Sequence, residues 1–292
     1  MISEILITGI AVGITYKFLK REATTLEKIE YNIEDEKIPK EFDNYKILQI
    51  SDLHNKTFGK SNIKLIEEID KINPDIIVIT GDLVDGEKDN FKVALDLIDY
   101  ISCKYKVVHV VGNHEQKSLN KKYKKEYKEY FRLLKDKDII DLNNDKIKVN
   151  KGSSYINLYG VVVPLEYYPY FFSNYRNKNK ALDKNFMDES LGKIDKNSYN
   201  ILLAHNPFFF ENYSNWGADL VLSGHVHGGI VRIPKIGGVL SPNREFFPKY
   251  DLGEYNLNGS KMILSKGLGG SKVVIRINCK PEIVQINLKS KK

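Results

Sequence analysis

The stretch Leu222-Ser223-Gly224-His225-Val226-His227-Gly228-Gly229 places two histidines two positions apart, directly after an apolar run. In an extended segment, side chains at positions i and i+2 point to the same side, so His225 and His227 can approach one ligand together. The chain has only six histidines, and three of the other four also lie in short polar breaks that end apolar runs. This pattern predicts one site built where several strands end.

Short apolar runs and helical periodicity alternate in the first half of the chain. Short apolar runs bounded by polar residues or glycine are typical of buried strands, and apolar residues every three to four positions are typical of amphipathic helices. Upstream, Ile29, Tyr31 and Ile33 alternate with polar residues, as in an edge strand. The predicted buried strands are residues 46–50, 76–80 and 107–111, and the predicted helices are residues 62–72, 91–101 and 119–134.

The second half of the chain consists mainly of short apolar runs separated by glycine and proline, and a polar, helical stretch ends before Gly192. The predicted strands are residues 155–163, 200–204, 220–223, 231–233, 262–265, 273–277 and 283–288. Strand–helix alternation followed by many strands predicts an α/β fold of four layers, in which two mixed β-sheets form a sandwich flanked by helices.

Ligand-type side chains follow five of these predicted strands. They are Asp52 and His54, Asp82, Asn113 and His114, His205, and His225 and His227. Ligands of open α/β sheets bind beyond the carboxyl ends of the strands, so we expect these groups to share one rim. Mixed oxygen and nitrogen donors without thiolate suit Mn, Fe or Zn. The set is too large for one ion and fits two ions that share a bridging carboxylate.

Each of these residues also has an ordinary structural interpretation. A lone aspartate after a strand, such as Asp52 or Asp82, is often a helix N-cap. Asn113 alone could be a turn residue after glycine, and His114 alone a solvated loop group. His109 lies inside a predicted strand, so we interpret it as a core histidine. The other candidate residues all occur together at strand ends, and this favours a metal centre over separate structural roles.

Five blocks of the sequence resemble those of the calcineurin-like metallophosphoesterases, in the family's order. They are Asp52-Leu53-His54, Gly81-Asp82, Gly112-Asn113-His114-Glu115, His205, and Gly224-His225-Val226-His227. The resemblance extends over residues 31–288. The segments that flank the blocks are similar to a bacterial, membrane- or wall-associated branch of that family.

The resemblance implies the metallophosphoesterase fold and hydrolysis of a phosphate ester by a hydroxide that bridges two divalent ions, with Mn as the first choice and Fe or Zn as the others. The implied ligands are Asp52, His54 and His227 for the first ion, Asn113, His205 and His225 for the second, and Asp82 as the bridge. His114 would be the catalytic histidine beside the substrate phosphate. Asp85 could orient His114 or could equally be a helix cap.

The implied substrate is a phosphomonoester or a small phosphodiester, with a membrane or cell-envelope lipid-linked ester as a candidate. No arginine follows Asp82 where the phosphoprotein phosphatases carry one, which argues against that activity. Residues 159–163 lack the acidic pair that many members of the bacterial branch carry there, so the substrate side of the site could differ from theirs. The alternatives are a nuclease or cyclic-nucleotide phosphodiesterase and a non-catalytic metal-dependent scaffold. The presence of His114 argues against the scaffold.

Composition narrows the range of partners. The net charge is +7, but the excess lysines are dispersed, which is usual for a solvated surface, and no Arg-rich stripe marks a nucleic-acid groove. We therefore expect no nucleic-acid partner. Cys103 and Cys279 lie far apart and indicate neither a disulfide framework nor a thiolate metal site.

The N-terminus carries an apolar run, residues 5–16, that is followed by Lys17, Lys20 and Arg21. It is shorter than the roughly 20 residues of a membrane span, but stretched to Leu19 it could just cross a bilayer or dip into one. We therefore divide the chain into an N-terminal hydrophobic segment, residues 1–25, and a catalytic domain, residues 26–292. The hypothesis is a membrane-associated enzyme, and the alternative is a helix packed on the domain of a cytoplasmic one.

Residues 167–175 are dense in tyrosine and phenylalanine. The stretch could pack beneath a long loop, or it could form an apolar flap near the site or near a membrane surface.

Overall fold

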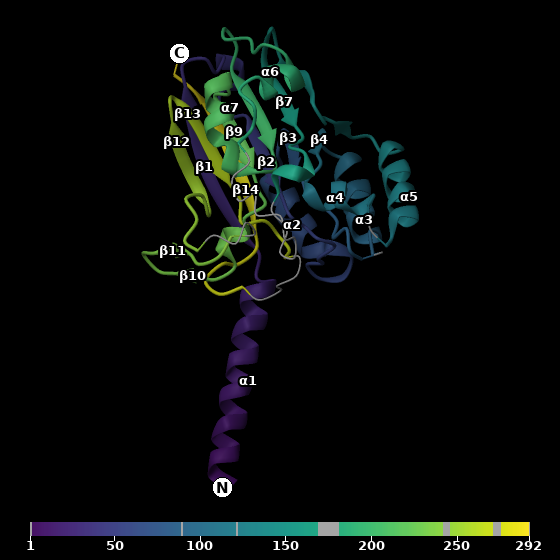
Figure 1. Ribbon diagram of the computed structural model, residues 1–292, viewed down its shortest axis with the longest axis vertical. Coiled ribbons are helices and arrows are strands. Elements are labelled where there is room, and N and C mark those ends of the chain that lie inside the picture. Colours follow the sequence, from purple (N-terminus) through teal and green to yellow (C-terminus); the bar gives the residue numbers. More distant parts are fainter. Residues whose placement is uncertain are drawn as a thin grey trace.

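The computed structural model describes residues 2–88, 90–120, 122–168, 181–241, 246–270 and 276–291, with side-chain surroundings from Val12 onward. Two six-stranded sheets face each other, and helices cover their outer faces (Figure 1). This is the predicted α/β sandwich of two mixed sheets. The remaining two strands, β10 (Arg232–Ile233) and β11 (Gly237–Gly238), form a separate antiparallel hairpin.

The first sheet has the strand order β1-β14-β2-β3-β4-β5. Its strands are β1 (Glu27–Asp35), β14 (Glu282–Ser290), β2 (Lys46–Ile50), β3 (Ile76–Thr80), β4 (Val107–Val110) and β5 (Ile140–Asp141). The predicted edge strand is confirmed, since β1 lies at the sheet edge. Strands β2 to β5 are parallel, whereas β14 runs antiparallel to β2. The ends of β2, β3 and β4 therefore meet at one edge.

The second sheet has the order β12-β13-β9-β8-β7-β6. Its strands are β12 (Gly253–Leu257), β13 (Ser260–Leu264), β9 (Leu220–Ser223), β8 (Asn200–Ala204), β7 (Ser154–Val161) and β6 (Asp145–Lys151). The four central strands are parallel, and antiparallel edge strands close the sheet on both sides. This sheet therefore also gathers its strand ends at one edge.

Three apolar clusters define the layers. The helices are α2 (Ile63–Ile72), α3 (Lys92–Ser102), α4 (Asn113–Ser118), α5 (Lys124–Lys135), α6 (Phe186–Leu191) and α7 (Phe210–Trp216), with 3-10 turns at Lys40–Phe42, Lys60–Asn62, Leu165–Tyr167, Pro207–Phe209 and His227–Gly229. Helices α2, α3 and α5 pack on the first sheet, and α6 and α7 pack on the second. Between the sheets, Ile47 and Val78 pack with Ile201 and Leu222. This central cluster fixes the two strand-end edges relative to each other.

Helix α1 (Ile2–Thr24) projects from the sandwich along the long axis of the molecule (Figure 1). Its residues 12–18 are exposed, so this part of the helix does not pack on the domain. Within the part of the chain that the structure describes, no helix has both the length and the apolar character that spanning a membrane requires.

The structure differs from the sequence prediction between residues 113 and 135. One helix was predicted for residues 119–134, but two helices are present, and α5 begins only at Lys124. The first, α4, begins at Asn113 immediately after β4, because the Glu115 carboxylate accepts the Gly112 amide in the first turn. Residues 273–275 of the predicted strand 273–277 and residues 169–175 of the aromatic stretch lie outside the described residues, and Ile277 forms an isolated bridge with Val231.

Candidate metal centre

The loop after β2 carries Asp52 and His54. The Asp52 amide donates to the Gly81 carbonyl at 3.0 Å, and the His54 amide donates to the Asp82 carbonyl at 3.0 Å. The loop is therefore hydrogen-bonded along its length to the neighbouring loop after β3. This pairing directs the Asp52 and His54 side chains toward Asp82.

Asp82 is positioned by the start of α4. Its carboxylate Oδ1 accepts the His114 amide at 2.8 Å. The carboxylate of Glu115 accepts the Asp82 and Gly112 amides, both at 2.9 Å, and the Val84 amide at 3.3 Å. One fully buried side chain, Glu115, therefore fixes the loops that carry Asp82, Asn113 and His114 relative to each other.

The second sheet contributes histidines after β8 and β9. His205 Nδ1 lies 2.7 Å from the Thr80 carbonyl oxygen. Because a carbonyl only accepts, Nδ1 carries a proton, and Nε2 faces Asp82, where it could bind a metal ion once it is deprotonated. The His225 amide donates to Asp52 Oδ2 at 3.0 Å, which ties the loop after β9 to the first sheet.

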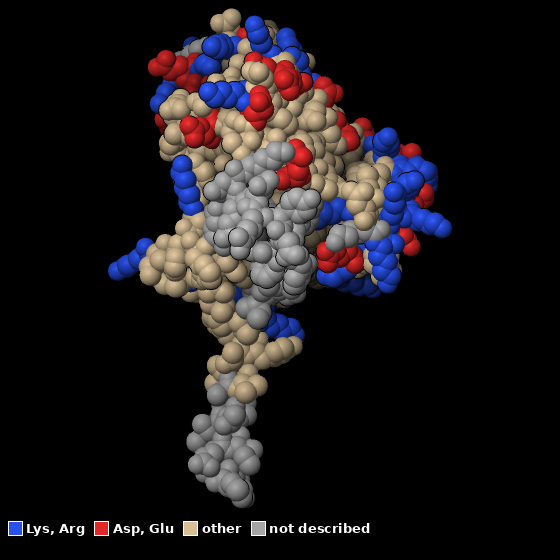
Figure 2. Space-filling view, in the orientation of Figure 1, with Lys and Arg blue, Asp and Glu red and all other residues tan. Residues whose placement is uncertain are grey.

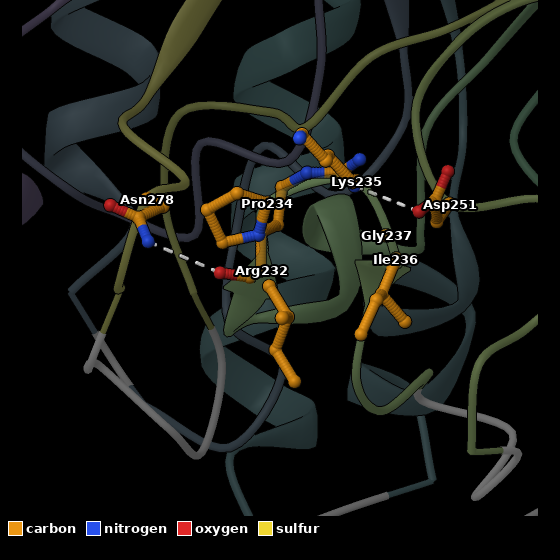
Figure 3. A pocket seen from close by; sticks show the side chains of 8 residues that line it. Arg232, Pro234, Lys235, Ile236, Gly237, Asp251 and Asn278 are labelled. Carbon is orange, nitrogen blue, oxygen red and sulfur yellow. Dashed lines mark hydrogen bonds and ion pairs between the residues drawn. The ribbon is translucent and has the colours of Figure 1, made fainter.

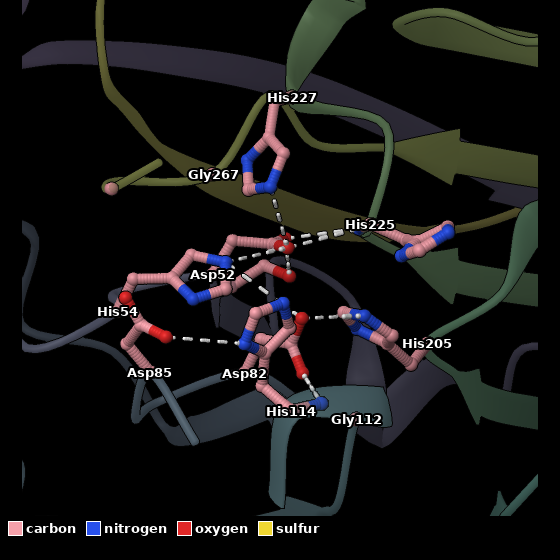
Figure 4. A network of polar contacts seen from close by, with 12 residues as sticks. Asp52, His54, Asp82, Asp85, Gly112, His114, His205, His225, His227 and Gly267 are labelled. Carbon is pink, nitrogen blue, oxygen red and sulfur yellow. Dashed lines mark hydrogen bonds and ion pairs between the residues drawn. The ribbon is translucent and has the colours of Figure 1, made fainter. Parts of the chain in front are cut away.

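The predicted ligands meet at the shared edge of the two sheets (Figure 4). Asp82 Oδ2 lies 3.2 Å from His205 Nε2 and 3.7 Å from His54 Nε2. Asp52 Oδ1 lies 3.8 Å from both His54 Nε2 and His227 Nε2. Two groups with spacing suited to a metal ion are Asp52, His54 and His227 on one side, and Asp82, His205 and His225 on the other. A third group joins His114 to His54 and Asp82.

Several donor atoms in this cluster are buried and make no hydrogen bond with any described residue. They are both ring nitrogens of His54, Asn113 Oδ1, His114 Nδ1, His205 Nε2, His225 Nε2 and His227 Nδ1. Buried polar atoms normally find partners, so this concentration of unsatisfied donor atoms needs an explanation. Two divalent ions would satisfy most of them, and the oxygen–nitrogen donor set suits transition metals. The residues therefore fit a dinuclear metal site.

The backbone is strained at the same residues. Asp52, His54, Asp82, His225 and His227 all have φ between 48° and 74°, a left-handed conformation that is uncommon outside glycine. Such strain persists where the surrounding structure enforces it, and it concentrates at functional sites. The loops of both sheets therefore have this left-handed backbone conformation at their candidate ligands.

Two glycines make room for the carboxylates. A Cβ on Gly112 would lie 2.2 Å from Asp82 Oδ1, and a Cβ on Gly224 would lie 2.4 Å from Asp52 Oδ2. Any larger residue at either position would displace a carboxylate from the centre. The glycines of these sequence blocks therefore have a steric role in the site.

Opposing charges set the protonation of the buried groups. Burial favours the neutral form of Asp82, but His205 and His114 outweigh it and hold the pKa of Asp82 well below its usual range. Burial also favours neutral His205, yet the charge of Asp82 raises the pKa of His205 to about 9. Burial lowers the pKa of His227 to about 3 and also lowers that of His225. The cluster thus combines an anionic Asp82 and a His205 whose charged form is favoured with the neutral imidazoles of His225 and His227.

The structure also shows the surroundings of residues outside the predicted ligand set. Asp85 Oδ1 lies 3.5 Å from His114 Nδ1, which favours the orienting role over the helix cap. His109 is buried inside β4, as predicted for a core histidine. The role of Glu115 was missed, although its place in the Gly-Asn-His-Glu block marked it. Tyr168 was also missed as a neighbour of the site, and its ring lies 5.0 Å from that of His225 in an edge contact.

Fold and site together define a protein with a dinuclear metal centre at the common edge of a two-sheet sandwich. The calcineurin-like phosphoesterase family matches residues 45–229, and the chain belongs to this family of metal-dependent phosphoesterases.

The chain is similar to bacterial relatives over almost its whole length. YkuE, an uncharacterized metallophosphoesterase of Bacillus subtilis (strain 168), is 25% identical over 275 residues, which cover 92% of this chain and 87% of YkuE. An uncharacterized metallophosphoesterase of Aquifex aeolicus (strain VF5) is 29% identical over 282 residues, covering 94% and 96%. Among solved structures, phosphopantetheinyl hydrolase (PptH) from Mycobacterium tuberculosis aligns with 76% of this chain and 89% of its own, with a TM-score of 0.46 and 14% identity.

Proposed function

We propose that this chain hydrolyses phosphomonoesters or small phosphodiesters with two divalent metal ions. The observation that carries the proposal is the convergence of buried, unsatisfied donor atoms from both sheets on Asp52 and Asp82. When bound, two such ions supply the Lewis acidity that phosphoester hydrolysis requires. The residues of the chain hold those ions, orient the ester and exclude bulk water from the buried centre.

The proposed ligand assignment follows the two groups of side chains. Asp52, His54 and His227 would hold the first ion, and Asp82 would contribute to both. The second ion would be held by His205, His225 and Asn113, whose Oδ1 is buried and makes no hydrogen bond to the described residues.

We assign His114 a catalytic role beside the substrate phosphate. Its ring contacts that of His54 at a centroid distance of 4.6 Å, and its Nδ1 faces Asp85. Burial lowers the pKa of His114 against the opposing effects of Asp82 and Asp85. A histidine placed this way can hold a proton at its ring for the leaving alkoxide. Because His114 also lies near His54 and Asp82, retention of both ions in a His114 variant separates this role from metal binding.

Manganese is the proposed metal, with Fe and Zn as the other candidates, because the donors are carboxylate, amide and imidazole without thiolate. Purified chain stripped of metal and reloaded with each ion in turn should hydrolyse nitrophenyl esters fastest with Mn. Full activity after treatment with a strong chelator would contradict any metal dependence.

The direct test uses the Mn-loaded full chain with mono- and bis-nitrophenyl phosphate, beside the double variant Asp82→Asn/His114→Ala. We expect the wild type to hydrolyse at least one ester and the double variant to show only background. Equal rates in the two proteins would overturn the proposal and point to a contaminating phosphatase or to a non-catalytic scaffold.

We also propose that the chain associates with a membrane surface through α1. The exposed apolar residues of α1 and the basic residues that follow them support this. Cell fractionation of the full chain beside a variant that lacks residues 2–24 tests it. Recovery of both proteins in the soluble fraction would favour a cytoplasmic enzyme.

A further inference from the structure

Every residue of helix α1 between positions 12 and 18 is exposed, and four of them are large apolar side chains. Val12, Ile14 and Tyr16 are 62%, 65% and 65% exposed, and Phe18 is 45% exposed. Helices in water gain most of their stability from packing an apolar face against other parts of the protein. This part of α1 has no such packing on the described domain, so it requires an apolar partner.

The β10–β11 hairpin and a nearby strand-like segment expose further large apolar groups. Ile236 is 63% exposed at the hairpin tip, and Phe246 and Phe247 are 72% and 53% exposed. Phe246 bridges to Leu240, which follows the hairpin. The large exposed apolar side chains of the described residues are Val12, Ile14, Tyr16, Phe18, Ile63, Ile233, Ile236, Phe246 and Phe247. All but Ile63 therefore belong to α1, to the hairpin or to the segment beside it.

The topology places these features at the edge that carries the metal centre. Strand β1 starts just after α1 and is parallel to β14, which is antiparallel to β2. The end of α1 therefore lies where β2 ends, next to Asp52 and His54. Lys56 Nζ donates to the Ala23 carbonyl of α1 and to the Leu268 carbonyl at 3.0 Å, which connects the helix directly to this loop.

The hairpin lies at the same end of the long axis as α1 (Figure 1), and residues 276–280 connect the two. The Arg232 amide donates to the Ile277 carbonyl at 3.0 Å, and Asn278 Nδ2 donates to the Arg232 carbonyl at 3.2 Å. Lys280 Nζ then lies 3.9 Å from Glu22 Oε1 near the end of α1.

Arg232 fixes the hairpin to the loop of His227. Its Nη1 donates to the Gly228 carbonyl at 3.1 Å and pairs with Asp251 Oδ2 at 2.8 Å. The hairpin, Asp251 and Asn278 line a pocket of about 440 Å³ (Figure 3). The hairpin that carries the apolar tip is therefore hydrogen-bonded to the loop of the metal centre.

Basic side chains border the apolar groups. Lys17, Lys20 and Arg21 are exposed in the last turns of α1, Lys235 is exposed in the loop of the hairpin, and Lys249 is exposed in residues 246–249. In Figure 2, the lobe at lower left above α1 is largely tan with blue at its edge, and the acidic side chains visible in this view lie above it and to its right. Apolar groups bordered by lysine and arginine suit the surface of a membrane with anionic lipids.

We propose that α1, the hairpin and residues 246–249, together called the docking end, bind an anionic lipid surface and turn the metal centre toward it. Lipid binding by the docking end does not depend on the proposed phosphoesterase function. If that function holds as well, the substrate is a phosphate ester carried at the membrane surface. The apolar tips enter the interface, the basic groups contact lipid phosphates, and the strand-end edge faces the headgroups.

Vesicle binding tests the docking end without reference to catalysis. The Mn-loaded full chain is floated with vesicles of phosphatidylcholine alone or with 30% phosphatidylglycerol, where the percentage is a roughly typical anionic fraction for such probes. We expect binding to the anionic vesicles that weakens as salt is raised, because screening reduces the contribution of the lysines.

Two double variants separate the apolar from the electrostatic contribution to vesicle binding. Ile233→Ser/Ile236→Ser removes apolar contact without changing charge and should weaken binding roughly tenfold. Lys235→Glu/Lys249→Glu should weaken it at least about 25-fold, since each basic residue near an anionic leaflet contributes roughly fivefold. The matched control, Lys124→Glu/Lys128→Glu, makes the same charge change on exposed positions of α5 and should bind as the wild type does.

Nitrophenyl phosphate hydrolysis shows that each variant is folded, and we expect it to stay at the wild-type level. Vesicle binding that is absent in the wild type, or equally weakened by the α5 control, would overturn the docking end. If light scattering shows instead a dimer that the Ile233→Ser/Ile236→Ser variant dissociates, the apolar groups contact a second copy and the membrane proposal fails. Vesicle binding without any ester hydrolysis would retain the docking end and reject the phosphoesterase proposal.

Discussion

The two sheets make unequal contributions to the metal centre. The first sheet supplies both carboxylates, Asp52 and Asp82, along with an imidazole and an amide from neighbouring loops. The second sheet supplies only the imidazoles of His205, His225 and His227. In the proposed site, the negative charge that attracts cations would therefore come from one sheet, and the other would complete the coordination with imidazoles that are neutral when they bind.

The two sheets also differ in how their loops are held. Glu115 connects the loops of the first sheet to each other through three backbone amides. The second-sheet loops are held by contacts across to the first, such as the His225 amide on Asp52 and His205 Nδ1 on the Thr80 carbonyl. Damage to the first sheet should therefore affect the whole centre, whereas damage to the second should stay local.

The strongest test of this asymmetry is Asp82→Asn. It removes the charge shared by both ion sites, so we expect both ions to bind weakly and kcat/KM to fall by about a thousandfold or more, which corresponds to the several kcal/mol that metal-ion catalysis supplies. Ester hydrolysis and metal content measure the two effects. Asp136→Asn, an exposed residue at the end of α5, is the control. Loss of a single ion in Asp82→Asn would show that the carboxylate is not shared.

His114→Ala should separate chemistry from metal binding within the first sheet. We expect kcat to fall by about 10²–10⁴, the usual contribution of a general acid, while two ions per chain remain. Metal analysis beside steady-state kinetics checks both parts. Asp85→Asn should reproduce a smaller part of the loss if it orients His114. A His114 variant that lacks one ion would instead make this histidine a ligand.

Glu115→Gln tests the anchoring of the first-sheet loops. The glutamine keeps one acceptor oxygen but turns an amide N–H toward backbone donors, so Asp82 should lose its fixed position. Changes to residues that support metal ligands typically cost about 10–100-fold in metal affinity or activity. Glu129→Gln on the exposed surface of α5 serves as the control. Wild-type metal affinity and activity in Glu115→Gln would show that the three amide contacts are dispensable.

The pH dependence of metal binding should have the smallest effect, and it compares the two proposed ion sites. Asp82 outweighs burial and raises the pKa of His205 to about 9, so in the metal-free protein this imidazole is protonated at pH 7. A metal must displace that proton, and affinity at this ion site should therefore rise about tenfold per pH unit between roughly pH 6.5 and 8.5. His227, whose pKa burial lowers to about 3, releases no proton in this range. Titrations with Mn at three pH values measure the slope, and a flat profile would contradict the charged His205.

The α/β sandwich of two mixed sheets was predicted from the sequence and is confirmed, whereas the roles of the candidate ligands stay predictions. Strand ends marked by Asp, His and Gly are local signals, and the ligand residues they identified lie together in the structure. Polar edge strands such as β6 and β12 were missed because they bury little apolar surface and so lack a hydrophobic pattern. The spacing within the Gly-Asn-His-Glu block encodes only the contact of Glu115 with the Gly112 amide. Its contacts with the Asp82 and Val84 amides depend on a separate loop, which no spacing in the sequence places.

The central claim is that the two sheets together hold two ions, and the Mn content and electron paramagnetic resonance spectra of the wild type, His225→Ala and His227→Ala measure this directly. We predict two exchange-coupled Mn ions in the wild type and one uncoupled ion in each variant, with His225→Ala losing the ion near His205 and His227→Ala the ion near His54. One ion in the wild type, or equal loss of both ions in the two variants, would contradict the account.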